Sequence, residues 1–207
     1  MMDPAMMDMI MSLRGRSISD TQILRAMESV PRRAFVPSSL QDKAYHDQDL
    51  PIACGQSLLA PFTVAVMSQM LELKAENKLL EIGTGSGYHS AVLSRLTKRV
   101  YSVERYKQLI ADAELRLRDL GVYNVVTRHG DGRYGWKGQA PYDRIIVTCG
   151  LIAPPETLLN QLASSGILIA SIDGQLTKFS KARSRISEAI LLPLTLPIIE
   201  AGKSKSL

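Results

Sequence analysis

The chain of 207 residues contains few of the residues that mark several large classes of protein. Its two cysteines, Cys54 and Cys149, are too few and too far apart for a disulfide framework or a metal-ligand pattern. Aromatic residues make up only 5% of the chain, which argues against a surface that stacks nucleic-acid bases. No apolar run approaches the roughly 18 residues of a membrane span. We therefore expect a cytoplasmic protein without metal, membrane or nucleic-acid partners.

What is present is the composition of an ordinary globular domain. Hydrophobic residues make up 45% and charged residues 22% of the chain, and the net charge is a modest +5. A chain of this length buries roughly 70% of its unfolded surface in one core. The methionine-rich start has no basic region and is not a secretory signal. We expect a flexible segment at 1–18 and a single domain at 19–207, with N-terminal substrate or lid elements (19–76) and a cofactor-binding core (77–200).

The most distinctive stretch is residues 79–88, Leu-Leu-Glu-Ile-Gly-Thr-Gly-Ser-Gly-Tyr. Apolar residues typical of a buried strand run into three alternating glycines, and a helix-compatible segment follows. Glycine permits positive φ and removes the Cβ that would hold a ligand away, while the first N–H groups of a helix are free to donate. We therefore expect a ligand at this corner. The residues expected to form it are Gly83, Thr84, Gly85, Ser86 and Gly87.

The spacing of the turn and its acidic neighbours indicate which ligand binds. A dinucleotide-binding turn has the pattern G-x-G-x-x-G, but its third glycine would fall on Tyr88, and no Gly-Lys-Ser/Thr of a P-loop follows. Glu81 would repel a pyrophosphate and attract the ammonium of an amino-acid moiety. Glu104, roughly 20 residues further on, lies where a ribose-binding acid belongs. S-adenosylmethionine is therefore favoured, with Asp131-Gly132 expected at the adenine amine, although Asp-Gly is also a common turn pair.

Helix and strand signals alternate through the rest of the chain. Such alternation predicts an α/β fold with a parallel sheet and right-handed crossovers. The last two apolar segments have no helix between them and are predicted to pair as an antiparallel edge, and a basic group before them is interpreted as a solvated loop. Predicted helices are 19–29, 38–44, 61–73, 88–96, 107–120 and one ending at 162; predicted strands are 79–82, 99–103, 124–129, 143–148, 167–171, 186–192 and 194–199; the basic group is Lys178, Lys181, Arg183 and Arg185.

With these residues in place, the chain resembles protein-L-isoaspartate (D-aspartate) O-methyltransferases along most of its length. The resemblance implies a seven-stranded, Rossmann-like methyltransferase sheet, mostly parallel with an antiparallel C-terminal edge, plus an N-terminal helical and loop extension. It also implies S-adenosylmethionine as donor, S-adenosylhomocysteine as product, and the free carboxylate of an isoaspartyl residue in a damaged protein as acceptor. The matching segments are 30–32, 35–37, 44–45 with 47, 50–52, 55–57, 81–88, 101–105, 130–132, 135–136, 140–143 and 145–148.

The resemblance breaks in the substrate loop. Family members usually read Gly-Gln-Thr-Ile-Ser-Gln-Pro there, and residues 55–61 read Gly-Gln-Ser-Leu-Leu-Ala-Pro. Ser57 keeps a hydroxyl where the family has threonine and is the candidate catalytic residue beside the acceptor. Leu59 occupies the position of the family's active-site serine, and Ala60 replaces a polar residue. The substrate-loop candidates are Gly55, Gln56, Ser57, Leu59 and Ala60.

Three functions are compatible with this pattern. The first is repair-type carboxyl methylation of isoaspartyl proteins or peptides. The second keeps the fold and the donor but methylates a small molecule or another carboxylate, and the third is a degenerate cofactor-binding protein. Carboxyl methylation needs no general base, because a carboxyl of ordinary pKa is ionised at pH 7. One lost hydroxyl donor costs about 1.5–3 kcal/mol, which weakens such an enzyme without necessarily abolishing its activity. The oligomeric state is not indicated.

Overall fold

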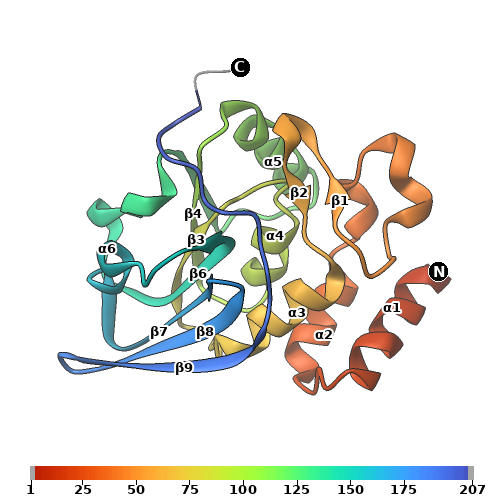
Figure 1. Ribbon diagram of the computed structural model, residues 1–207. Coiled ribbons are helices and arrows are strands. Elements are labelled where there is room, and N and C mark those ends of the chain that lie inside the picture. The colour runs from red at the N-terminus through yellow and green to blue at the C-terminus, as the bar shows by residue number, and fades with distance from the viewer. Residues whose placement is uncertain (1–2, 205–207) are drawn as a thin grey trace.

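A seven-stranded sheet in the order β5-β4-β3-β6-β7-β8-β9 organises the fold of residues 3–204, which the computed structural model describes (Figure 1). The strands from β5 to β7 in this order are parallel, and β8 and β9 are antiparallel to their neighbours. This is the predicted fold class. The strands are β3 (Lys78–Ile82), β4 (Arg99–Glu104), β5 (Val125–His129), β6 (Tyr142–Leu151), β7 (Leu162–Ile172), β8 (Gln175–Ala182) and β9 (Arg185–Pro193).

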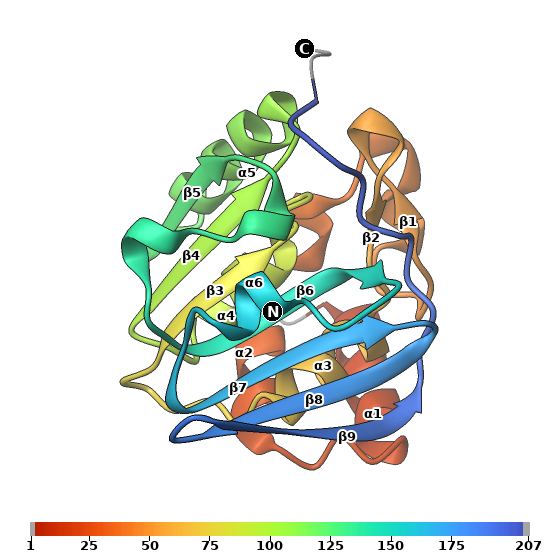
Figure 2. The same cartoon turned by 60° about the vertical axis from the view of Figure 1, so that its left-hand side comes forward.

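Helices cover both faces of the sheet. Helices α1 to α5 lie on one face and the short α6 on the other (Figures 1 and 2). Successive strand residues point to opposite faces, so Leu79 joins the core under α1 to α4 while Leu80 joins the core under α6. The helices are α1 (Pro4–Gly15), α2 (Thr21–Ser29), α3 (Pro61–Met70), α4 (Tyr88–Ser94), α5 (Lys107–Asp119) and α6 (Glu156–Leu159), with short 3₁₀ turns at Arg32–Phe35 and Ser38–Lys43.

The N-terminal segment differs from the prediction of flexibility over residues 1–18. Residues 1 and 2 lie outside the described part, but Pro4–Gly15 forms helix α1, which Asp3 caps by accepting from the Ala5 N–H. Its buried side chains contact the helices α2 and α3. The methionine-rich sequence supplies this apolar face, so the helix is held by packing rather than by intrinsic preference. The buried residues are Met6, Met9, Ile10 and Leu13.

The C-terminal part corrects two further predictions. The basic stretch interpreted as a solvated loop contains strand β8, because Leu176 and Phe179 are buried beneath it while Lys178 and Lys181 extend from half-buried positions to carbonyl or carboxylate partners. The antiparallel edge is therefore β8 with β9. Residues 194–199 form no strand of the sheet; they cross the strand ends, with a single bridge between Gly150 and Ile198. In residues 3–204 no helix is long and apolar enough to cross a membrane.

Candidate active site

The glycine corner lies at the carboxyl end of β3, as predicted. Gly83, Gly85 and Gly87 all have positive φ, at 97°, 54° and 90°. At Gly83 a side chain is excluded by contact as well, because a Cβ would lie 2.4 Å from the Thr148 hydroxyl oxygen. That hydroxyl donates to the carbonyls of Ile82 (2.8 Å) and Gly83 (3.0 Å), which ties the end of β6 to the corner. The backbone at the corner is thus fixed and open to a ligand.

Glu104, at the carboxyl end of β4, holds the corner from the other side. Its carboxylate accepts from the backbone N–H of Gly85 (3.0 Å), Arg105 (2.7 Å) and Tyr106 (3.0 Å). The side chain is 6% exposed and lines the cavity at the corner. A carboxylate has roughly four acceptor positions, so three N–H groups leave capacity for a hydroxyl donor. Glu104 therefore suits the predicted role of binding a ribose.

Glu81 lies elsewhere than the sequence suggested. It is fully buried under the turn, where it accepts from the hydroxyls of Ser90 and Ser102, and it does not line the cavity. Burial raises the pKa of Glu81 to about 7, against the lowering effect of the two serine hydrogen bonds. The alternation along β3 directs this side chain toward helix α4. In this structure Glu81 lies beneath the corner and is enclosed by the turn, β4 and helix α4.

The carboxylate of Asp131 is bonded to other residues of the protein. It pairs with the Arg133 guanidinium (2.7 Å) and accepts from the backbone N–H of Gly202 (2.7 Å). The hydrogen bonds from Arg133 hold the pKa of this carboxyl below its ordinary value. Asp131 does not line the cavity, whereas its neighbour Gly132 does. A Cβ on Gly132 would lie 2.4 Å from the Ile82 side chain, so this position also needs glycine.

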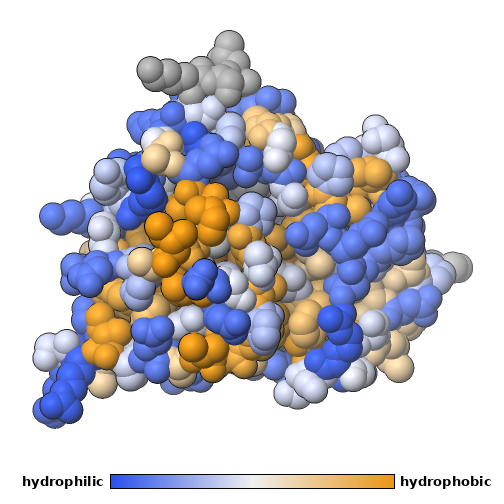
Figure 3. Space-filling view, viewed as in Figure 1, coloured by the Kyte–Doolittle hydropathy of each residue, from blue (hydrophilic) through white to orange (hydrophobic). Residues whose placement is uncertain are grey.

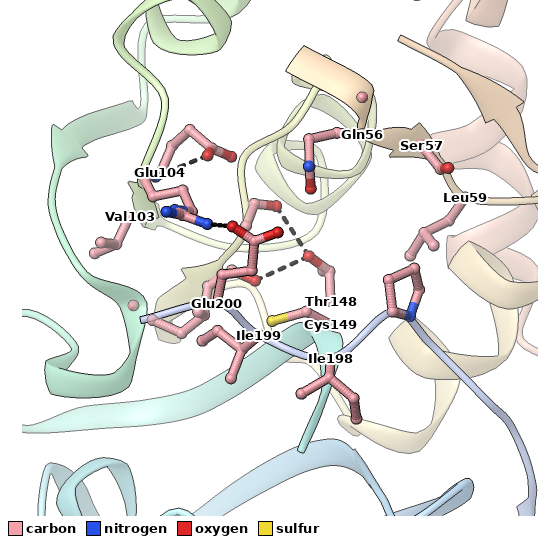
Figure 4. Close-up of a pocket in the computed structure, with 16 residues that line it drawn as sticks. Gln56, Ser57, Leu59, Val103, Glu104, Thr148, Cys149, Ile198, Ile199 and Glu200 are labelled. Carbon is pink, nitrogen blue, oxygen red and sulfur yellow. Dashed lines mark hydrogen bonds and ion pairs between the residues drawn. The ribbon is translucent and has the colours of Figure 1, made fainter. Parts of the chain in front are cut away.

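A cavity of about 230 Å³ opens between the corner, the substrate loop and the C-terminal segment (Figure 4). A smaller cavity of about 90 Å³ adjoins it and shares Glu104, Thr148 and Cys149 with it. Of the predicted residues, Thr84, Gly85 and Ser86 line only the smaller cavity, and Gly87 lines neither. The predicted residues that line the larger cavity are Gly55, Gln56, Ser57, Leu59, Gly83, Glu104 and Gly132.

The substrate loop belongs to a small hairpin, β1 (Leu50–Pro51) with β2 (Ser57–Leu58), that forms one wall of the cavity. The buried Arg32 side chain donates to the Leu59 carbonyl (2.8 Å), and Asp49 accepts from the Ala60 N–H (2.6 Å). Ser57 and Leu59 line the cavity, and Ala60 does not. The loop that departs from the family pattern is therefore fixed in place beside the glycine corner.

The sequence reasoning missed the wall that the C-terminal segment provides. Pro197, Ile198, Ile199 and Glu200 line the larger cavity, and Glu200 pairs with Arg105, which lines it too (Figure 4). A signal was available, because Pro197 lies inside the segment predicted as a strand and has no N–H to donate to a neighbouring strand. Thr148 and Cys149, near the carboxyl end of β6, also line the cavity and were not assigned a role.

The residues present fit a nucleoside with an attached amino acid. Two glycines let the ligand approach the backbone, and Glu104 retains an acceptor position for a ribose hydroxyl. Ile82, Val103 and Ile199 give the cavity apolar surface suitable for a base. Within residues 3–204 no group of three or more His, Cys, Asp or Glu side chains is placed to hold a metal ion.

Comparison with known proteins identifies the family. The family model for protein-L-isoaspartate(D-aspartate) O-methyltransferase (PCMT) matches residues 5–192. The chain belongs to this family. A protein-L-isoaspartate O-methyltransferase of Maricaulis maris (strain MCS10) is 44% identical over 209 residues, covering 99% of this chain and 98% of the relative. One from Parvibaculum lavamentivorans is 41% identical over 207 residues, covering 96% and 93%.

Solved structures agree with the PCMT family assignment. A protein-L-isoaspartate O-methyltransferase superposes with a TM-score of 0.84 and 27% identity; the alignment covers 95% of this chain and 66% of that chain's length. A Plasmodium falciparum protein, solved in complex with S-adenosyl-L-homocysteine, has a TM-score of 0.80 and 20% identity, with 93% and 97% covered. The second likeness shows that the fold is the same. The predicted family and fold are both confirmed.

Proposed function

We propose that this PCMT family member transfers a methyl group from S-adenosylmethionine to the free carboxylate of isoaspartyl residues in damaged proteins, and releases S-adenosylhomocysteine. The observation that carries the proposal is the family match over residues 5–192, together with a corner whose glycines and Glu104 suit the donor. Isoaspartyl proteins or peptides are then the partners. Two free cysteines suit a reducing cytoplasm, where we place the enzyme.

We assign the donor side of the site as follows. Glu104 accepts from the ribose hydroxyls, and the backbone of Gly83 and Gly85 borders the amino-acid moiety. Gly132 lies at the base, while Asp131 acts through its bonds to Arg133 and Gly202, and Glu81 acts by supporting the turn. The bound donor supplies an electrophilic methyl group on a sulfonium, which becomes a thioether when the methyl passes to a carboxylate oxygen.

The acceptor side relies on orientation and on excluding water. Ser57 presents a hydroxyl beside the cavity, and the Leu59 side chain stands where a second hydroxyl is usual in the family. Well-aligned reactants gain roughly 7–11 kcal/mol from proximity, which exceeds the value of one hydrogen bond. Burial raises the pKa of the nearby Cys149 thiol to about 12, so at neutral pH this group is a neutral wall and not a nucleophile.

The decisive experiment measures methyl transfer to an isoaspartyl peptide and to the same peptide with ordinary aspartate. The protein sample is first shown by calorimetry to bind S-adenosylhomocysteine. We expect turnover of the isoaspartyl peptide only. Binding of S-adenosylhomocysteine without turnover of that peptide would reject the acceptor while keeping the donor.

The position of Leu59 supports a second candidate, a methyltransferase of another carboxylate or small molecule. Leu59 and Cys149 line the cavity, and Leu59 makes the acceptor side less polar than the serine that the family usually has at that position. Under this alternative, Leu59→Ser combined with Ala60→Gln raises isoaspartyl turnover at least tenfold. An unchanged rate in the double variant shows that the loop is not what limits isoaspartyl methylation.

A further inference from the structure

Two apolar side chains from distant parts of the chain line the same cavity. Leu59 comes from the substrate hairpin and Ile198 from the C-terminal segment, with Pro197 beside it (Figure 4). Ile198 is 54% exposed and also lines the cavity, so part of its apolar surface is open to a ligand. The space-filling view shows apolar side chains gathered where the C-terminal segment crosses the strand ends (Figure 3). An apolar surface continuous with a reaction site is typical of ligand recognition.

Both side chains are held by fixed backbone. The Leu59 carbonyl accepts from Arg32, and the next residue's N–H donates to Asp49. On the opposite side, Gly150 donates to the Pro197 carbonyl (2.8 Å) and accepts from the Ile199 N–H (2.9 Å), so Ile198 is bonded on both sides to the end of β6. A site held this way loses little freedom when it binds, and the distance between its walls is preset.

The charges at this cavity disfavour a substrate in which the residue adjacent to the isoaspartyl residue is charged. Arg105 is the cationic side chain lining it among residues 3–204, and it is paired with Glu200. Glu104 is bonded to three backbone N–H groups. An acidic side chain next to the isoaspartyl residue would therefore lie near Glu104 and Glu200 with no unpaired cation to neutralise it. A basic side chain would lose its hydration against the apolar side chains that line the cavity. An apolar side chain instead buries its surface against Leu59 and Ile198.

We propose that Leu59 and Ile198 form an apolar clamp that selects isoaspartyl acceptors with an apolar side chain on a residue adjacent to the isoaspartyl residue. The inference rests on the proposed function and specifies its substrate class. Leu59 then has a role of its own. It lacks the hydroxyl of the usual serine, but its side chain contacts the residue adjacent to the isoaspartyl residue. One buried aliphatic side chain discriminates by roughly 10- to 200-fold, and we expect about tenfold here because Ile198 remains partly in water.

The test uses isoaspartyl peptides that differ only in the residue before or after the isoaspartate, with leucine, glycine or glutamate at that place. Turnover is measured as kcat/KM, and binding is measured separately by competition on the protein loaded with S-adenosylhomocysteine. At one of the two places we expect the leucine peptide to have a kcat/KM about tenfold higher than the glycine peptide, and higher still relative to the glutamate peptide. The binding affinities should follow the same order. The difference should lie in KM, because the clamp does not touch the reacting atoms.

Three variants and one control assign the preference to the clamp. Ile198→Ser, at a half-exposed position, should keep the fold and reduce the leucine-to-glycine ratio to near one. Leu59→Ser should do the same, and Leu59→Val, which keeps an apolar side chain at that position, should retain a preference for the leucine peptide, which a merely damaged loop would not give. Ile152→Ser is the matched control, since Ile152 is 81% exposed and does not line the cavity.

The outcomes separate this inference from the proposed function. Equal binding of leucine and glycine peptides at both places, or a preference that survives both serine variants, overturns the clamp. Turnover of no isoaspartyl peptide rejects the proposed acceptor. In that case the binding comparison still decides whether the walls select apolar side chains.

Discussion

At the scale of single residues, Glu104 and Glu81 show how two carboxylates of similar sequence context acquire different roles. Glu104 is bonded to backbone N–H groups and lines the cavity, so it remains available to a ligand. Glu81 is enclosed beneath the turn and bonded to serine hydroxyls. Strand position decides this difference, because Glu104 ends its strand while Glu81 lies inside one.

Replacing Glu104 by glutamine tests its role toward the donor. The amide nitrogen cannot accept, so either the N–H groups of the corner or the ribose hydroxyls lose a charged partner. We expect the affinity for S-adenosylhomocysteine to fall by about 1.5–3 kcal/mol, measured by titration calorimetry. Glu188→Gln on exposed strand β9 is the control and should bind like the unaltered protein. Unchanged affinity in Glu104→Gln would remove Glu104 from the donor site.

Glu81 predicts how stability depends on pH. Its folded-state pKa of about 7 lies above the ordinary value of 4.5, so the folded state favours the protonated carboxyl. The stabilisation is fully present below pH 4.5 and is lost as the pH rises through 7, amounting to about 3 kcal/mol. In Glu81→Gln we expect the free energy of unfolding, measured in urea from pH 5 to 8 without cofactor, to fall less with pH. Parallel curves for the two proteins would contradict the assignment.

At the scale of elements, the C-terminal segment joins strand ends that are far apart in sequence. Gly150 at the carboxyl end of β6, Asp131 after β5 and Arg105 after β4 each bond to residues between 197 and 204. Arg105 lines the cavity of the expected donor site, and Gly150 and Asp131 are each next to a residue that lines it, Cys149 and Gly132. The segment therefore acts as a wall of that site rather than as a strand of the sheet.

The ion pair between Arg105 and Glu200 should influence how long the product stays bound. Glu200 is 63% exposed, so the pair is worth at most about 1 kcal/mol and is screened by salt. In Glu200→Gln we expect S-adenosylhomocysteine to dissociate about two- to fivefold faster in stopped-flow measurements at low salt. In 1 M salt the two proteins should dissociate at similar rates. A difference that persists in high salt would point to a contact other than the ion pair.

At the scale of the whole molecule, the N-terminal helices and the sheet share one core. Leu13 of α1 and Leu79 of β3 belong to the same cluster of buried side chains, which continues through α2, α3 and α4. Arg32 extends this connection to the cavity, since it holds the Leu59 carbonyl. We infer that residues 3–200 unfold as one unit in which the N-terminal elements position the substrate loop.

Truncating a buried side chain on α1 tests whether this helix unfolds together with the rest of the protein. Leu13 is 2% exposed, so Leu13→Ala should lower the free energy of unfolding by about 2–5 kcal/mol. Met11→Ala, at a position 61% exposed on the same helix, should change it by less than about 0.5 kcal/mol. Circular dichroism and the fluorescence of Trp136 should report one coincident transition. A local loss of helix without a change in the tryptophan transition would mean that α1 folds separately.

Much of the fold followed from local patterns. The alternation of strands and helices from residue 78 to 148 appears in the structure within a few residues, and the glycine corner lies where its spacing placed it. The predictions failed where side chains of distant segments decide the outcome. The Met-rich start became α1 because other helices cover it, and the basic stretch became β8 because Leu176 and Phe179 are buried on opposite faces of the sheet.

The amino-acid order alone determined the corner, the parallel core and the family, because backbone conformation at glycine and the periods of strands and helices are local properties. Tertiary structure decided which side chains reach the cavity. Glu81 is directed away from it, Asp131 is held by Arg133 and Gly202, and residues 197–200 enter it from the far end of the chain. Such placements depend on contacts between segments many residues apart, which no local pattern encodes.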